Sequence, residues 1–234
     1  MNLDLGRTLR VIVLTSWAAF FVYLAVSGEM ARYLGPRTYW VVIFGATVLV
    51  AVAVAHITTP PSVSGAAPSV RESLATLALL VPLMAVLVVP NADLGALAAA
   101  NRGQLGGATS ASSLIPTPDG GELSFIDIHF ANESDSYAAG AGVAPGVAVD
   151  LIGFVSERFE GSGDTFRLSR FYVSCCAADA FPYSVTVRTS EAGRQFAEDA
   201  WLRVTGTLQR TGDGFLVLAE RVGPVQEPDD PYLY

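Results

Sequence analysis

The chain has 234 residues, a mean hydropathy of +0.43 and a formal net charge of −8, and only 15% of its residues are charged. This acidic balance argues against nucleic-acid binding, which needs basic patches that displace phosphate counterions. The sequence contains no phosphate-binding loop, dinucleotide-binding glycine motif or serine-hydrolase elbow, so we expect a protein that is not an enzyme.

Apolar residues gather in the first hundred positions, where three segments carry no charge. Each reaches the ~20 residues that a helix needs to cross a bilayer. We therefore predict transmembrane helices at about 10–28, 39–57 and 73–90. Pro82 lies inside the third segment and should kink it, which membrane helices tolerate when neighbours satisfy the freed carbonyl.

The arginines beside these segments predict an orientation. Arg7 and Arg10 precede the first segment and favour a cytoplasmic amino terminus. Arg32 and Arg37 argue for the opposite orientation, whereas Arg71 again supports the first. Three spans with a cytoplasmic start make this a multi-pass protein of the plasma membrane, in contact with the lipid bilayer, whose remaining domain is extracytoplasmic.

Charge changes sharply near residue 103. Residues 1–103 carry six arginines against four acidic residues, whereas residues 104–234 carry eight against eighteen. We assign 1–103 to a transmembrane domain, in which we expect 94–100 to form a short helix at the membrane surface. Glycine, serine, threonine and proline dominate 104–121, which predicts a flexible linker. Residues 122–234 then form a soluble, acidic β domain.

Alternating apolar residues predict five strands in the soluble domain, with a helical or loop insertion at 191–200. The segment 122–137 fits either a strand or a short amphipathic helix. Five short strands match the OB-fold, with an SH3-like barrel or a sandwich as alternatives. The predicted fold class is membrane-anchored α + β: three N-terminal transmembrane helices followed by a small five-stranded OB-like β-barrel. The strands are expected at 147–159, 165–176, 181–189, 200–210 and 214–225.

The two cysteines of the chain, Cys175 and Cys176, are adjacent, and Asp179 follows. Adjacent thiols are poor structural staples, because a useful disulfide closes a long loop. Two thiolates and a carboxylate are ligands for Zn or Cu(I). His129 or His56 supplies a further ligand only if the fold brings it close. We therefore predict a metal site formed by Cys175, Cys176 and Asp179, with Zn or Cu(I) as the bound ion.

Both sulfurs can reach one ion only where the strand ends or bends, because adjacent side chains of a strand point to opposite faces. The run Ala177–Ala180 after the pair favours such an end. The alternatives are a vicinal disulfide, or one cysteine that packs in the core as a small hydrophobic residue. The pair Asp127 and His129 could orient an imidazole, although such pairs arise often by chance.

Four stretches of the chain share a pattern with known proteins: Ser27–Leu34, Asn101–Gly103, Gly153–Val155 and Arg170–Ala180, with the CCAADA run as the most specific. Together they resemble the YcgQ-like family of bacterial membrane proteins. The resemblance implies a non-enzymatic accessory subunit of a two-component permease, whose partner is a larger multi-spanning permease of the YcgR type. On this basis we expect the β domain to bind or gate a substrate, for which a transition-metal ion is our hypothesis.

Two other functions use the same cysteines. A thiol redox sensor would form a reversible bond between Cys175 and Cys176. A structural envelope protein would bind another envelope protein through the barrel, and its cysteines would only pack in the core.

Overall fold

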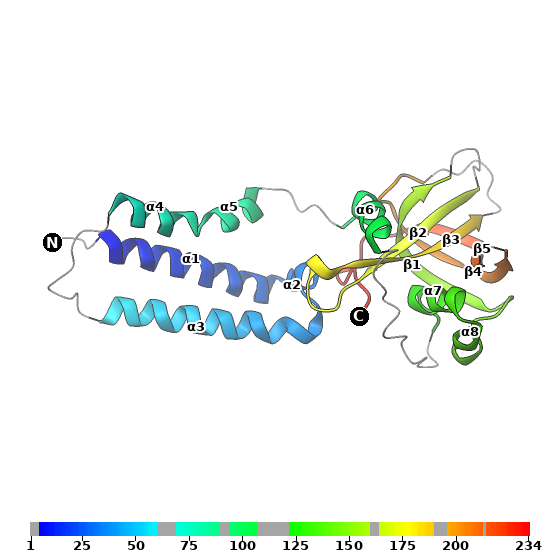
Figure 1. Ribbon diagram of the computed structural model, residues 1–234, viewed down its shortest axis with the longest axis horizontal. Helices are drawn as coiled ribbons and strands as arrows, with labels where there is room; N and C mark the ends of the chain where they lie inside the picture. Colours follow the sequence, from blue (N-terminus) through cyan, green and yellow to red (C-terminus); the bar gives the residue numbers. More distant parts are fainter. Residues whose placement is uncertain are drawn as a thin grey trace. The chain divides into compact units, whose positions relative to one another are not determined.

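The structure is a computed structural model. It describes residues 5–59, 69–88, 94–106, 122–159, 164–189, 196–212 and 214–234. The chain divides into two compact units, which we call the helical unit (Met1–Asp93) and the barrel unit (Leu94–Tyr234). Figure 1 shows the helices of the first unit and the sheet of the second.

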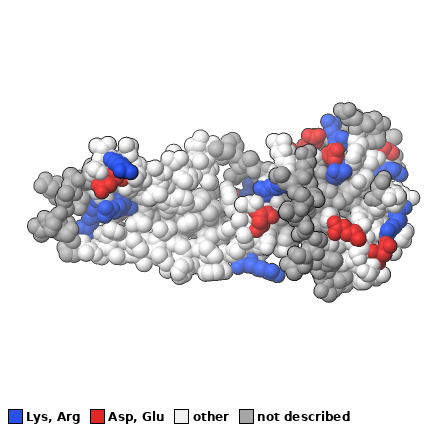
Figure 2. Space-filling view, viewed as in Figure 1, with Lys and Arg blue, Asp and Glu red and all other residues white. Residues whose placement is uncertain are grey.

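The helical unit contains two long apolar helices, α1 (Leu5–Ser27) and α3 (Tyr39–Thr58), with α2 (Met30–Tyr33) and η1 (Pro36–Thr38) between them. Within them, Gly6–Ser27 and Pro36–Thr58 are long and apolar enough to cross a membrane. Figure 2 shows that the surface over these helices has a broad band without charged side chains. This supports two of the three predicted spans.

Arg7 at the start of α1 reaches the end of α3. Its guanidinium donates to the carbonyls of His56, Ile57 and Thr59. The last carbonyls of a helix have no partner within the helix, so Arg7 caps α3 and holds the two helices antiparallel, side by side (Figure 1).

The third predicted span is wrong as a single helix. The structure has two short helices instead, α4 (Val70–Ala78) and α5 (Val81–Val88), and neither of them reaches the length of a span. The break has a physical cause, because Pro82 has no N–H and its ring clashes with the carbonyl four residues earlier. The indole of Trp17 in α1 donates to the Leu79 carbonyl at the break, at 3.0 Å.

The barrel unit contains five strands that form a closed barrel in the order β1-β2-β3-β5-β4. β1 pairs with β4 to close the barrel, and β3 pairs with β5 in parallel. The predicted five-stranded β-barrel is therefore confirmed. The predicted second strand extends too far, since β2 ends at Tyr172. The strands are β1 (Ala148–Arg158), β2 (Thr165–Tyr172), β3 (Phe181–Thr189), β4 (Trp201–Thr211) and β5 (Gly214–Pro224).

Three helices accompany the barrel: α6 (Ala96–Gly106), α7 (Phe125–Glu133) and α8 (Asp135–Ala141). The segment that fitted either a strand or a helix is thus helical. Ser124 and Asp127 form a reciprocal capping box at the start of α7, which satisfies amides that a helix start leaves without partners. α6 groups with the barrel unit, because it packs on β1 and β3.

Buried side chains of the barrel unit form two separate groups. The larger group, the main core, fills the barrel and includes Ile128 of α7 and Val187 of β3, both 0% exposed. The smaller group, the outer cluster, consists of Ala99, Phe154, Phe171, Val173, Ala180 and Tyr232. The rings of Phe154 and Phe171 are stacked with their centroids 5.5 Å apart. α6 is therefore held by a cluster of its own.

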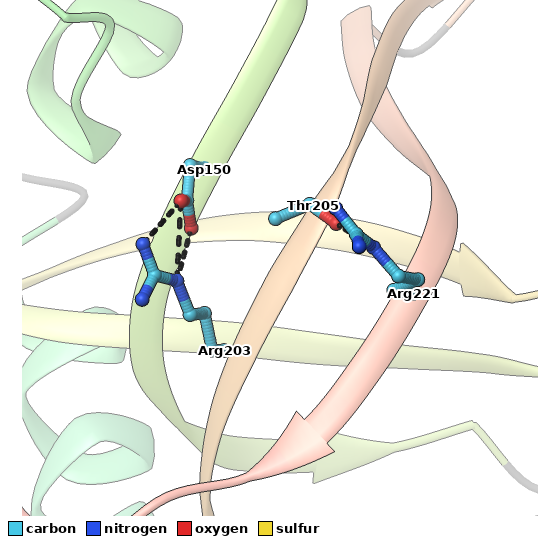
Figure 3. Close-up of polar contacts among 4 residues, drawn as sticks. All are labelled: Asp150, Arg203, Thr205 and Arg221. Carbon is cyan, nitrogen blue, oxygen red and sulfur yellow. Dashed lines mark hydrogen bonds and ion pairs between the residues drawn. The ribbon is translucent and has the colours of Figure 1, made fainter.

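Ion pairs on the barrel surface join neighbouring strands. Figure 3 shows Arg203 of β4 donating to both oxygens of Asp150 on β1, with Nε at 2.8 and 3.1 Å. The hydrogen bond from Arg203 lowers the pKa of Asp150. Arg221 of β5 donates to Thr205 of β4 at 3.4 Å. Exposed pairs of this kind contribute little stability, so the main core carries most of it.

Candidate metal centre

The two cysteines lie in the connection between β2 and β3. β2 ends at Tyr172, and a short 3-10 helix, η3 (Ala177–Asp179), follows the pair. Because the strand ends first, the two sulfurs are not forced to opposite faces, and they lie 3.7 Å apart. We call residues 174–179 the cysteine turn.

Asp179 builds this turn. One carboxylate oxygen accepts the amide N–H of Ser174 at 2.9 Å, and the other accepts those of Cys175 at 2.8 Å and Cys176 at 3.3 Å. Hydrogen bonds to a charged acceptor are about twice as strong as those between neutral groups. The carboxylate therefore fixes the backbone on which both thiols are mounted.

The same carboxylate also raises the pKa of the Cys175 thiol. The hydrogen bond between this thiol and Asp179, followed by that to Cys176, raises the pKa of Cys175 to about 12. Burial opposes the ionisation of Asp179, but the hydrogen bonds from Cys175 and from the three amides outweigh it and lower the pKa of Asp179. At neutral pH the turn thus holds a proton between a sulfur and an ionised carboxylate.

A cation can take the place of that proton. One ligand atom from each of Cys175, Cys176 and Asp179 lies within 4.8 Å of the others. In a tetrahedral zinc site with Zn–S bonds of about 2.3 Å, two sulfurs lie about 3.8 Å apart, close to the 3.7 Å seen here. A disulfide would need about 2.05 Å, and neither cysteine forms a disulfide. The three predicted residues therefore have a geometry that suits a tetrahedral ion.

The exposure of the two cysteines argues against the alternative in which one of them packs in the core. Cys175 is exposed and Cys176 is half-buried, so neither packs in the core. An exposed thiol can exchange an ion with a partner or with solvent.

The histidines lie elsewhere. His129 in α7 pairs with Glu133 at 3.4 Å and its ring contacts that of Tyr183, with centroids 4.9 Å apart. Burial lowers the pKa of His129. Among the described residues, the group of close ligand atoms contains neither His129 nor His56. The carboxylate of Asp127 bonds Ser124 and the Tyr137 hydroxyl rather than orienting an imidazole.

Arg102 contacts this site, and it was not among the site residues predicted from the sequence. From α6, its Nη1 donates to the carbonyls of Ala177 at 3.0 Å and Ala180 at 2.8 Å, on either side of Asp179. The only signal in the sequence was its place in the run Asn101–Gly103 that carries the family resemblance. Backbone carbonyls leave no mark in a sequence, so the partner of this arginine could not be foreseen.

A separate hollow of about 690 Å³ lies between α6 and the strands, and no residue of the cysteine turn lines it. Ser156 and Ser184 stand in its wall. Their hydroxyls bond that of the fully buried Ser169, at 2.6 and 2.7 Å. The ion pair of Glu157 with Arg167, at 2.7 Å, lies at the same wall. These hydroxyls satisfy one another, and among the described residues no buried side-chain nitrogen or oxygen lacks a hydrogen-bond partner.

Comparisons with known proteins place one part of the chain. No curated protein shows significant similarity to it. The chain is similar in structure to the small single-stranded DNA-binding protein from Streptomyces coelicolor, with 19% identity over 36% of this chain and 96% of that one. The TM-score of 0.26 is too low to support any inference. Residues 142–234, which include all five strands and the cysteine turn, match the DUF1980 C-terminal domain.

Proposed function

We propose that this chain is a non-enzymatic accessory subunit of a membrane permease, and that its barrel unit binds a transition-metal ion in the cysteine turn. The observation that carries this proposal is the close grouping of ligand atoms from Cys175, Cys176 and Asp179. Two sulfurs and one oxygen favour Zn or Cu(I) over hard cations. The distance between the sulfurs favours tetrahedral Zn²⁺.

Three protein ligands leave one position open. Structural zinc sites use four protein ligands, whereas sites that exchange a ligand keep one free. The exposed sulfur of Cys175 suits a site that passes an ion to a partner. A partner residue, water or the transported group would complete the coordination.

A titration of the full-length protein in detergent tests the metal site. We expect Co²⁺, as a coloured substitute for zinc, to give an absorption band from its bonds to thiolate, and Zn²⁺ to abolish that band. The double variant Cys175→Ser/Cys176→Ser should lose the band. His129→Gln is the matched control, because His129 lies outside the group of ligand atoms. Equal zinc affinity in the double variant and the native protein would overturn the metal site.

Membrane anchoring by α1 and α3 is the second part of the proposal. Two helices have the required length and composition. With a cytoplasmic amino terminus, an extracytoplasmic barrel requires α4 and α5 to cross together as a third, broken span, with Trp17 satisfying the Leu79 carbonyl at the break.

Labelling of intact cells with a membrane-impermeant thiol reagent tests this topology, since Cys175 and Cys176 are the only thiols. A chelator is added so that a bound metal does not block them. Labelling without permeabilisation supports the extracytoplasmic barrel. Labelling that appears only after permeabilisation places the barrel in the cytoplasm, as expected if a chain with a cytoplasmic amino terminus crosses the membrane twice.

The permease partner rests on the family resemblance and on the match to the DUF1980 C-terminal domain. Purification of the tagged protein from native membranes should recover a multi-spanning protein of the YcgR type. Recovery of no multi-spanning protein would remove this part of the proposal and leave the metal site intact.

A thiol redox sensor is the second candidate, because the two sulfurs are in contact. The raised pKa of Cys175 weighs against it, since the thiolate is the reactive form. Mass spectrometry after mild oxidation distinguishes the two functions. A metal-binding pair with this thiol pKa should stay largely reduced, whereas a sensor should lose two hydrogens and form a vicinal disulfide.

A further inference from the structure

We infer that Arg102 is the positioning residue of the cysteine turn and that it couples ion binding in the turn to helix α6. The inference rests on the proposed metal site and adds a residue that lies in another element. The coupling would give a bound ion an effect on α6, the first helix of the barrel unit after the apolar helices in the chain.

The contact of Arg102 is made to the backbone of the turn itself. A single nitrogen, Nη1, donates to the carbonyls of Ala177 and Ala180. Ala177 is the first residue of η3 and Ala180 is its C-cap, and within this turn Asp179 donates its own amide to the Cys176 carbonyl at 2.9 Å. Arg102 therefore fixes the peptide units on either side of Asp179, and with them the carboxylate that organises both cysteines.

α6 is anchored to the barrel at its other end as well. The carboxylate of Asp199 accepts the amide N–H of Ala96 at the start of the helix. A Cβ added at Gly95 would lie 2.3 Å from that carboxylate, so glycine permits the close approach. Asp199 has φ of 65°, a left-handed conformation that residues other than glycine adopt only at a cost in free energy. This anchor is thus held by the surrounding structure.

Packing joins the two anchors. Ala99, between them on α6, belongs to the outer cluster together with Ala180, which follows Asp179, and Val173, which precedes the turn. α6 and the cysteine turn therefore share a hydrogen-bonded contact and a small apolar cluster. A rearrangement of the turn around an ion must be met by α6, and the effect is reciprocal, because linkage between two sites works in both directions.

Hydrogen exchange of the full-length protein in detergent, with and without Zn²⁺, tests both the positioning role of Arg102 and the coupling of the turn to α6. Without metal, Arg102→Ala should speed exchange of the amides at 174–176 at least tenfold and weaken zinc binding at least tenfold, with little change in the unfolding midpoint of the barrel. Arg102→Lys should restore most of both, because one ammonium nitrogen can donate to two carbonyls as Nη1 does. Arg203→Ala, which removes the surface pair with Asp150 (Figure 3), is the matched control and should change neither.

The outcomes separate the claims. Native exchange rates and native zinc affinity in Arg102→Ala would overturn the positioning role. Zinc should slow exchange of the α6 amides in the native protein but not in Arg102→Ala, and equal slowing in both would overturn the coupling. If the native protein binds no zinc, the proposed function fails, while exchange without metal still decides whether Arg102 positions the turn.

Discussion

The main core and the outer cluster of the barrel unit differ in what they support. The main core fills the barrel with apolar residues from all five strands and from α7 and α8. The outer cluster has six buried residues, and it lies beneath α6 and at both ends of the cysteine turn. The fold therefore rests on one group of side chains and the candidate site on another, so stability and ion binding should respond to different substitutions.

The largest effect expected is on the main barrel, at Gly206. A Cβ there would lie 2.1 Å from the Leu218 carbonyl oxygen and 2.9 Å from the Ala219 Cα. Gly206→Ala should therefore lower the free energy of unfolding by about 3 kcal/mol or more, measured by chemical denaturation. Gly212→Ala, where a Cβ would meet nothing within 4 Å, should change it by less than about 0.5 kcal/mol. Similar values for both would show that the strands can separate without cost.

A matched pair of valines tests the separation between the two groups directly. Val187 in the main core is 0% exposed, and Val173 in the outer cluster is 1% exposed. Each substitution to alanine should cost about 1–3 kcal/mol of unfolding free energy. Only Val173→Ala should weaken zinc affinity of the folded protein, because it precedes the turn. An equal loss of affinity in Val187→Ala would break the comparison.

The protonation of Cys175 makes ion binding pH-dependent. With a pKa of about 12, the thiol is protonated at neutral pH, and binding must release its proton. Zinc affinity should therefore rise at least tenfold for each unit of pH between 6 and 8, as calorimetry in different buffers can show together with the protons released. A flat profile would mean that the ion does not bind through this sulfur.

The smallest effect expected concerns His129, which lies against the main core. Burial lowers its pKa below the ordinary value of 6.5, so the unfolded chain binds a proton more readily than the folded one. The free energy of unfolding should then decrease as the pH falls through 6.5, by less than about 1 kcal/mol, since solvent screens a partly exposed ring. His129→Gln should remove this part of the pH dependence and leave zinc affinity unchanged.

The sequence predicted the barrel well because its strands alternate cleanly between apolar and polar residues. Periodicity alone did not settle Phe125–Glu133, since FIDIHF fits both periods, and the capping box of Ser124 and Asp127 favoured the helix. The third apolar segment is long enough for a span. A length rule takes no account of the helical hydrogen bond that Pro82 cannot donate, or of the clash between its ring and the preceding turn.

The candidate site also contains some residues that could be predicted from the sequence and others that could not. Cys175, Cys176 and Asp179 were predictable because they are close in sequence and carry recognisable chemistry. The roles of Arg102 and Asp199 were not, because each bonds a backbone group of a segment far away in the chain. Such contacts depend on the path of the chain, which pattern and composition do not contain.

The strand order also determines which pairs of strands can form early during synthesis and which must wait for later strands. The β1–β2 and β2–β3 pairs join neighbours in the chain, whereas the β1–β4 and β3–β5 pairs need strands that are made later. Local pairs close faster than distant ones, and a ribosome adds only about 5–20 residues per second. The cysteine turn, which joins β2 to β3, is therefore made before Tyr232 of the outer cluster is added to the chain. Until then the turn lacks one of the buried residues of the cluster that packs at both of its ends.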